Sequence, residues 1–138
     1  MTAEDRRQLI ADVKHAEGWR SKAYQDSVGV WTIGFGRNLQ TMTISQELGE
    51  AWLKDDLENA ESELRVFKWF DTLTSKRRAV LVEMNFNLGL SKLRRFTRLL
   101  AAIEQGNYVE AADQMMSSLW SQQVGARAKR LAEAMRKG

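Results

Sequence analysis

Hydrophobic residues recur at the spacing of an α-helix along most of this chain. A first helix is predicted over residues 2–17, because Thr2 and Asp5 form a capping-box pattern at its start and Gly18 follows its end. A second helix is predicted to begin after Ser45. The apolar positions at helical spacing are, in chain order, Leu9, Val13, Ala16; Leu48, Trp52, Leu57, Ala60, Leu64; Val80, Leu81, Met84, Leu88; Phe96, Leu99, Leu100, Ile103; Val109, Ala112, Met116, Leu119; and Val124, Ala128, Leu131, Met135.

The most apolar of these segments lies between Thr74 and Gly89, which read as the start and stop of a helix. Its centre, AVLVEMNF, is apolar on nearly every side. A helix of that kind is typical of the middle of a folded unit, so we expect it at the core.

Residues 20–43 have no helical period and are rich in glycine, aromatic and β-branched residues. A turn at residues 26–29 is predicted to join two short strands at about 21–25 and 30–35, and a third strand is predicted near 41–44. The fold class is therefore predicted as α+β, mostly helical with a small antiparallel three-stranded sheet.

The composition excludes several kinds of functional site. The chain of 138 residues has no cysteine and one histidine, His15, which excludes disulfides, thiolate catalysis and histidine-rich metal clusters. We therefore predict no metal and no cofactor. The N-terminus is charged throughout and no window holds the roughly 18 apolar residues of a membrane helix, so neither a signal peptide nor a transmembrane segment is predicted.

Charge is spread unevenly along the chain. Residues 1–75 hold 9 basic and 13 acidic side chains, whereas residues 76–138 hold 12 and 5. A basic second half is compatible with an anionic partner such as nucleic acid, a membrane surface or a cell-wall polymer. It is equally compatible with an ordinary solvated helix surface, so charge alone leaves the partner open.

Two carboxyl groups flank the first predicted strand. Glu17 ends a helix and Asp26 begins a turn. Glycoside hydrolysis uses such a pair, one to protonate the leaving oxygen and one to handle water or the sugar. Glu17 lies at the negative end of a helix dipole and borders the apolar position Val13, so partial burial and the dipole are expected to favour its protonated form. Asp26 is expected to stay charged in its polar turn.

The surrounding segment is more specific. HAEGWRSKAYQDSVGVWTIGFGRNL, at residues 15–39, resembles the active-site segment of the T-even-type phage lysozymes, glycoside hydrolase family 24. The resemblance continues in RRAVLVEMNFNLG, in NYVEAADQMMSSLW and in RAKR at 127–130. The residues in register with the family's first motif are Glu17, Gly18, Tyr24, Asp26, Gly29, Thr32, Ile33, Gly34 and Gly36.

This resemblance implies a role for each matching residue. Glu17 would be the general acid, Asp26 the base that orients the attacking water, and Thr32 a second group that holds this water. Arg127 would lie near the catalytic glutamate and support it. The reaction would invert the anomeric centre while cutting the β-1,4 bond between N-acetylmuramic acid and N-acetylglucosamine in bacterial peptidoglycan.

The resemblance also implies the domain organisation and further contacts. An N-terminal lobe with the sheet would span about 19–45, a long connecting helix about 46–66 and a helical lobe about 67–138, with helix 2–17 packing towards the last. Arg37 and Asp56 would form a structural ion pair. The chain departs from the T-even pattern at Asn38, Leu99 and Gln114. The implied substrate-binding positions are Tyr24, Trp31, Asn38, Phe86, Asn87, Leu99, Gln114 and Gln123.

A lysozyme without an export signal would accumulate in the host cytoplasm and reach the wall only after a separate, holin-like protein permeabilises the membrane. A monomer without a nucleic-acid partner is expected. Two alternatives remain: a lytic transglycosylase, which needs only one acid, and a non-catalytic basic module that binds nucleic acid or a wall polymer. The presence of Asp26 and Thr32 beside Glu17 argues against both.

Overall fold

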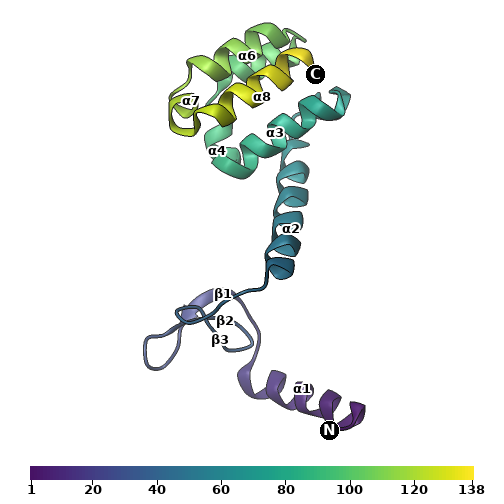
Figure 1. The fold of residues 1–138 in the computed structure, drawn as a ribbon, viewed down its shortest axis with the longest axis vertical. Coiled ribbons are helices and arrows are strands. Elements are labelled where there is room, and N and C mark those ends of the chain that lie inside the picture. The colour runs from purple at the N-terminus through teal and green to yellow at the C-terminus, as the bar shows by residue number, and fades with distance from the viewer. The chain divides into compact units, whose positions relative to one another are not determined.

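The computed structural model describes all 138 residues and divides them into two compact units, residues 1–46 and 47–138 (Figure 1). We call them the sheet unit and the helical unit. The predicted α+β class is confirmed, because a three-stranded antiparallel sheet accompanies a mostly helical chain. None of the helices is both long enough and apolar enough to cross a bilayer.

The sheet unit begins with helix α1 (Ala3–Glu17), whose predicted capping box is present. The Thr2 hydroxyl accepts a hydrogen bond from the backbone N–H of Asp5, and the Asp5 carboxylate accepts one from the N–H of Thr2. The Thr2 hydroxyl also donates to the Asp5 carboxylate at 2.7 Å, and this bond, more than the one from the backbone N–H, lowers the pKa of Asp5. None of the residues of α1 is buried, so its apolar stripe, which includes Leu9 and Val13, is exposed.

Three strands follow α1 in the order β1 (Arg20–Gln25), β2 (Trp31–Gly34) and β3 (Arg37–Asn38). The first two were predicted, but the position of the third, near 41–44, is wrong. Gly34 and Gly36 have φ of +69° and +75°, a left-handed conformation that glycine adopts without strain. The chain therefore reverses directly after β2, and β3 pairs with it at once.

The helical unit contains most of the regular structure. The predicted start at Thr74 and stop at Gly89 are confirmed as the caps of α3. Its elements are α2 (Gln46–Leu64), the short 3-10 helix η1 (Phe70–Thr72), α3 (Ser75–Leu88), α4 (Leu90–Leu93), α5 (Thr97–Glu104), α6 (Tyr108–Ser117), α7 (Leu119–Val124) and α8 (Ala126–Lys137).

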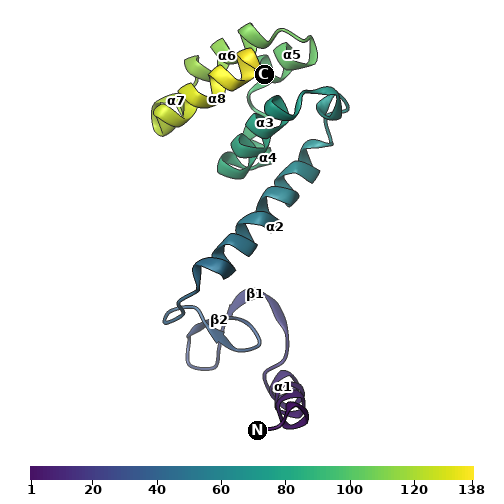
Figure 2. The ribbon, with the colours of Figure 1, turned by 45° about the vertical axis from the view of Figure 1, so that its right-hand side comes forward.

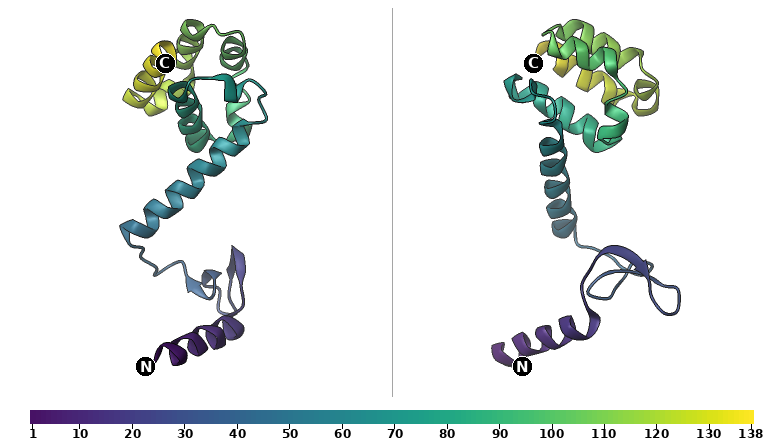
Figure 3. Two further views of the ribbon diagram at one scale, coloured as in Figure 1. Left: turned by 90° about the vertical axis from the view of Figure 1, so that its right-hand side faces the viewer. Right: turned by 180° about the vertical axis from the view of Figure 1, so that it is seen from behind.

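One core fills the helical unit. Helix α8 packs along α6 and against α3, and α5 packs against α6, as Figures 2 and 3 show. Alanines line the α6–α8 contact, which lets the two helices approach closely. The largest fully buried side chains are Leu64, Phe70, Val80, Leu81, Met84, Leu93, Leu99, Ile103, Met115, Leu131 and Met135.

The structure corrects two predicted helix faces. On α6 the buried side is Ala111, Ala112 and Met115, whereas Val109 and Met116 are exposed. This face of α6 is buried because its small alanines fit against α8. The spacing of apolar residues in the sequence does not reveal such a fit. The predicted stripe also continued to Leu119 on α7, which is 69% exposed, because Ser118 ends α6 and caps a new helix.

On α2 the predicted stripe ran from Leu48 to Leu64, but only Ala60 and Leu64 are buried. Trp52 is 47% exposed.

Helix α4 was not predicted at all. This helix begins directly after Gly89, whose φ of +82° ends α3, and it places Leu93 in the core.

Arg77 joins the start of α3 to the end of α8. Its Nε donates to the carbonyl of Met135 at 2.8 Å, its Nη2 donates to the carbonyl of Arg136 at 3.1 Å, and its guanidinium lies 3.5 Å from the ring centroid of Tyr108. The last carbonyls of a helix have no partner within the helix, so this side chain satisfies two of them.

We expect Arg77→Ala to lower the free energy of unfolding by about 1–3 kcal/mol, since it removes two charge-assisted hydrogen bonds and the ring contact. Arg77→Lys should recover only part of the lost free energy of unfolding, because an ammonium group lacks the planar, forked donor geometry of a guanidinium. Urea unfolding followed by circular dichroism measures both. The neighbouring Arg78→Ala is the control: its ion pair with Asp71 is exposed at 3.9 Å, and an equal loss there would contradict the assignment.

Candidate active site

The carboxyl group of Glu17 lies against the backbone of Gly36. Glu17 is the last residue of α1, and Gly18 then turns the chain into β1. A Cβ added to Gly36 would fall 2.8 Å from Cδ of Glu17, a distance that real Cβ contacts do not show. Gly36 therefore provides the space that the carboxyl occupies. Within the sheet unit Glu17 is exposed, and its partial burial stays a prediction.

The carboxylate of Asp26 is held by the turn that joins β1 to β2. Its Oδ1 accepts hydrogen bonds from the backbone N–H groups of Val28 and Val30, both at 2.9 Å. The backbone N–H of Asp26 donates to the carbonyl of Val30, which closes the same turn. One oxygen thus fixes the side chain, while Oδ2 makes no hydrogen bond within the chain. An anchored carboxylate with one free oxygen can accept a proton from water.

Thr32 lies in the middle of the sheet and is 5% exposed. Its hydroxyl donates to the carbonyl of Val30 at 2.9 Å, so its oxygen retains acceptor capacity. Tyr24 pairs with Thr32 and Thr32 with Asn38 in the two strand registers. Residues that pair directly across antiparallel strands point to the same face, so these three predicted site residues form one row.

The sheet separates other predicted residues from that row. Trp31 is adjacent to Thr32 along β2 and therefore points to the opposite face. Arg37 pairs with Ile33 and also lies on the opposite face, where its guanidinium donates to the carbonyl of Thr43 at 3.1 Å. Asn38 closes a turn with its own side chain, which accepts from the N–H of Gln40 at 2.8 Å. The ion pair of Arg37 with Asp56 stays a prediction.

Two aromatic side chains of the sheet unit were not predicted as site residues. Trp19 and Phe35 have ring centroids 5.1 Å apart and are 65% and 40% exposed. Trp19 directly follows the Glu17–Gly18 pair, and Phe35 lies between the two positive-φ glycines Gly34 and Gly36. Their position inside the family motif was the signal that could have marked them. They form an apolar surface next to Glu17.

In the helical unit, Arg127 is paired with a carboxylate that sequence reasoning missed. Its Nε donates to Oε1 of Glu83 at 2.9 Å, and Nη2 of Arg130 donates to the same oxygen. Glu83 lies on α3 and its side chain is 28% exposed. The hydrogen bond from Arg130, more than that from Arg127, holds the pKa of Glu83 below its usual range. The support that Arg127 gives to Glu17 stays a prediction.

Glu83 should make the stability of the protein pH-dependent. Because its pKa is lowered on folding, the Glu83 carboxylate stabilises the folded state at every pH above its unfolded pKa. This contribution is lost as the pH falls through the lower, folded pKa. We expect Glu83→Gln to remove about 1 kcal/mol at neutral pH and almost none once the pH lies well below the folded pKa of Glu83. Urea unfolding at several pH values measures this.

The control for this prediction is Glu104→Gln, which removes an exposed carboxylate of the same unit that forms no ion pair. It should leave the pH dependence of unfolding unchanged. If both variants flatten the curve equally, the ion pairs of Glu83 do not contribute to stability.

The other predicted substrate-binding residues of the helical unit lie in separate places. Phe86 is 43% exposed and lines a pocket of about 300 Å³ together with Asp56. Asn87 accepts a hydrogen bond from Nε1 of Trp120 at 2.8 Å, and Gln123 is exposed on α7. Leu99 and Gln114, although 15 positions apart in sequence, line one pocket of about 260 Å³.

The chemistry available in the sheet unit is acid–base chemistry. Glu17 and Asp26 supply two carboxyl groups in different surroundings, and Thr32 supplies a hydroxyl. No group of three or more histidine, aspartate and glutamate side chains could hold a metal ion.

Comparisons with known proteins agree with this chemistry. The family model described as phage lysozyme matches residues 14–137. The chain is 33% identical over 112 residues to an endolysin of Acyrthosiphon pisum secondary endosymbiont phage 1, covering 79% of this chain and 74% of that protein. It is 33% identical over 119 residues to the endolysin of Salmonella phage P22, covering 80% and 79%. It is 25% identical over 156 residues to "Probable T4-type lysozyme 1" of Dictyostelium discoideum, covering 91% and 92%.

Proposed function

Since the chain belongs to the phage lysozyme family and is thus a glycoside hydrolase of peptidoglycan, we propose that it cuts the β-1,4 bond between N-acetylmuramic acid and N-acetylglucosamine with inversion of the anomeric centre. Glu17 gives its proton to the glycosidic oxygen as the bond to the anomeric carbon breaks. A water molecule attacks that carbon from the opposite face, and Asp26 takes the proton that the water loses.

The observation that carries this proposal is the anchoring of Asp26. Two backbone N–H groups fix Oδ1, so the carboxyl group is oriented before any substrate binds. A base needs such orientation, whereas a transglycosylase, which closes the sugar on itself, needs no second carboxylate. Thr32 supports the same role, because its hydroxyl oxygen can receive a hydrogen bond from the attacking water.

The experiment that tests this mechanism follows the first product by proton NMR of freshly cleaved peptidoglycan. Inversion of a β bond releases the α anomer first. Initial release of the β anomer would mean retention, with Asp26 as a nucleophile. A 1,6-anhydro sugar would instead identify a lytic transglycosylase, and no new reducing ends at all would leave only a wall-binding module.

The biological setting belongs to the same proposal. A phage endolysin of this kind acts as a monomer on the wall of its host, after a separate membrane-permeabilising protein has given it access. Arg127 supports the acid, and Phe86 is among the residues that contact the glycan. Partners and access are tested by expressing the chain in bacteria with and without a permeabilising protein, where lysis should require both.

A further inference from the structure

Helix α8 begins with an arginine in a place that disfavours a positive charge. Arg127 is the second residue of α8, and the first turn of this helix contains no acidic residue. The N-terminus of a helix carries a partial positive charge, which stabilises anions there and not cations. The Arg127 side chain is also only 33% exposed, so water screens its charge incompletely. A guanidinium in this position needs a negative charge from another element.

Glu83 supplies this negative charge from α3, the helix that packs against α8. Its Oε1 accepts a hydrogen bond from Nε of Arg127 at 2.9 Å and a second one from Nη2 of Arg130. The two arginines are three positions apart on α8, so they lie on one face of the helix and reach the same oxygen. The bond from Arg130, more than that from Arg127, lowers the pKa of Glu83, which keeps the carboxylate ionised at neutral pH.

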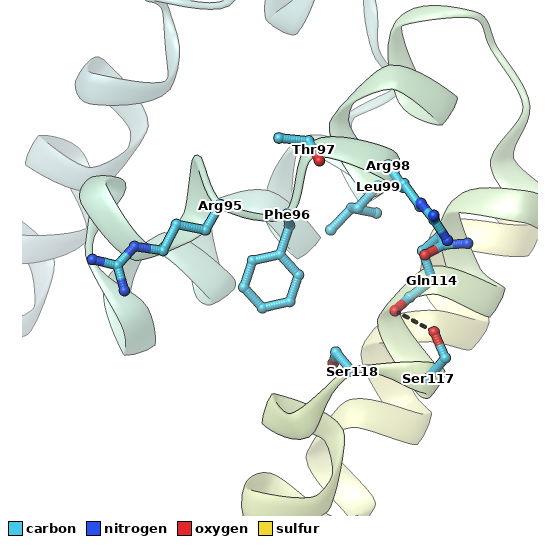
Figure 4. A pocket seen from close by; sticks show the side chains of 8 residues that line it. All are labelled: Arg95, Phe96, Thr97, Arg98, Leu99, Gln114, Ser117 and Ser118. Carbon is cyan, nitrogen blue, oxygen red and sulfur yellow. Dashed lines mark hydrogen bonds between the residues drawn. The ribbon is translucent and has the colours of Figure 1, made fainter.

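Other arginines of the helical unit have no such partner. Arg95 and Arg98, in the segment from α4 to α5, are exposed and form no ion pair. Figure 4 shows the Arg95 side chain directed away from those of Gln114 and Ser117. The pairing of Arg127 is therefore a specific feature of the contact between α3 and α8, and not a general property of the basic half of the chain.

The contact with Glu83 uses one part of the Arg127 guanidinium and leaves the other part open. A guanidinium has five N–H donors, one on Nε and four on the two terminal nitrogens. Glu83 accepts from Nε, and neither Nη1 nor Nη2 of Arg127 forms a hydrogen bond within the helical unit. Because the group is planar, fixing Nε also restricts the direction of the terminal nitrogens. Together they form a fork that fits a carboxylate.

We propose that Glu83 is a positioning residue of the reaction: by holding Nε of Arg127, it keeps the terminal nitrogens of this arginine oriented to support the catalytic acid. The inference rests on the proposed function, which gives Arg127 that support. Without Glu83, Arg127 would stay charged, but its long side chain would sample several rotamers and Arg130 would repel it. The rate of bond cleavage would then fall, whereas substrate binding, in which Glu83 has no part, would not change.

The test separates kcat from KM on soluble peptidoglycan fragments. We expect Glu83→Ala to lower kcat about fivefold and to leave KM within about twofold, because a misoriented supporting group is felt mainly in the transition state. Glu83→Gln should recover part of kcat, since its amide oxygen can still accept from Nε of Arg127. The matched control is Glu133→Ala, which removes an equal charge and two ion pairs, with Arg136 and Lys137, from the same unit. Its kcat should stay within about twofold.

A double-mutant cycle shows whether Glu83 acts through Arg127. In an Arg127→Ala background, Glu83→Ala should lower kcat no further, since no guanidinium is left to hold. Circular dichroism at the assay temperature checks that each variant is folded. If Glu83→Ala does not fold, Glu83→Gln takes its place in the cycle, and its smaller loss of kcat should likewise vanish in the Arg127→Ala background.

Three results would overturn the role of Glu83 and leave the proposed function intact: losses in kcat that multiply in the cycle, an unchanged kcat in the single Glu83 variant, or a change in KM instead of kcat. The proposed function fails by a different result, in which the unmodified protein releases no reducing ends from peptidoglycan. An unchanged kcat in Arg127→Ala alone would refute the support that Arg127 gives to the acid, and the role of Glu83 with it.

Discussion

Glu17→Gln and Asp26→Asn are each expected to lower the rate of wall lysis by a factor of about 100 or more, while the protein folds normally. A positioned acid or base contributes on this scale, and an amide can neither give nor take the proton. Asparagine at position 26 retains an oxygen that can accept from the N–H groups of Val28 and Val30, so the turn should persist. The loss would therefore be chemical. Turbidity of a wall suspension measures the rate.

The control is Asp12→Asn, an acid-to-amide change on the exposed surface of α1 in the same unit. It should leave lysis within a factor of two. Thermal unfolding of all three variants checks that the fold is kept. Lysis near the level of the unmodified protein in either Glu17→Gln or Asp26→Asn would refute the assignment of that residue.

Gly36→Ala is expected to cause the second largest loss, about tenfold or more in activity together with about 1–2 kcal/mol in stability. The stability term follows from the φ of +75° at Gly36, which a residue with a Cβ adopts only with strain. The activity term follows from the position of the new methyl group, which would occupy the space of the Glu17 carboxyl. A displaced acid transfers its proton less well.

Gly106→Ala separates these two effects. Gly106 has a φ of +73° in the turn between α5 and α6, and a Cβ there meets nothing within 4 Å. This variant should lose similar stability and keep its activity. If Gly36→Ala and Gly106→Ala have the same stability and the same lytic activity, the contact between Gly36 and Glu17 does not matter for catalysis.

Features set by short-range interactions could be predicted from the sequence. The capping box of Thr2 with Asp5 and the boundaries of α3 at Thr74 and Gly89 depend on hydrogen bonds and dihedral angles within a few residues. The turn at Asp26 is of the same kind. The roles of Glu17, Asp26 and Thr32 were likewise inferred from one contiguous segment, because the family motif records their spacing directly.

Only the tertiary structure decided which distant groups meet. Three contacts join residues that lie 15 to 44 positions apart in the sequence. They are the pairing of Arg127 with Glu83, the closeness of Gly36 to the Glu17 carboxyl, and the shared pocket of Leu99 and Gln114. No periodic pattern carries such information. A helical repeat tells which residues share a face, but packing, through the fit of small side chains between helices, selects the face that is buried. For the same reason β3 lies where two glycines reverse the chain, and not where the residues favour a strand.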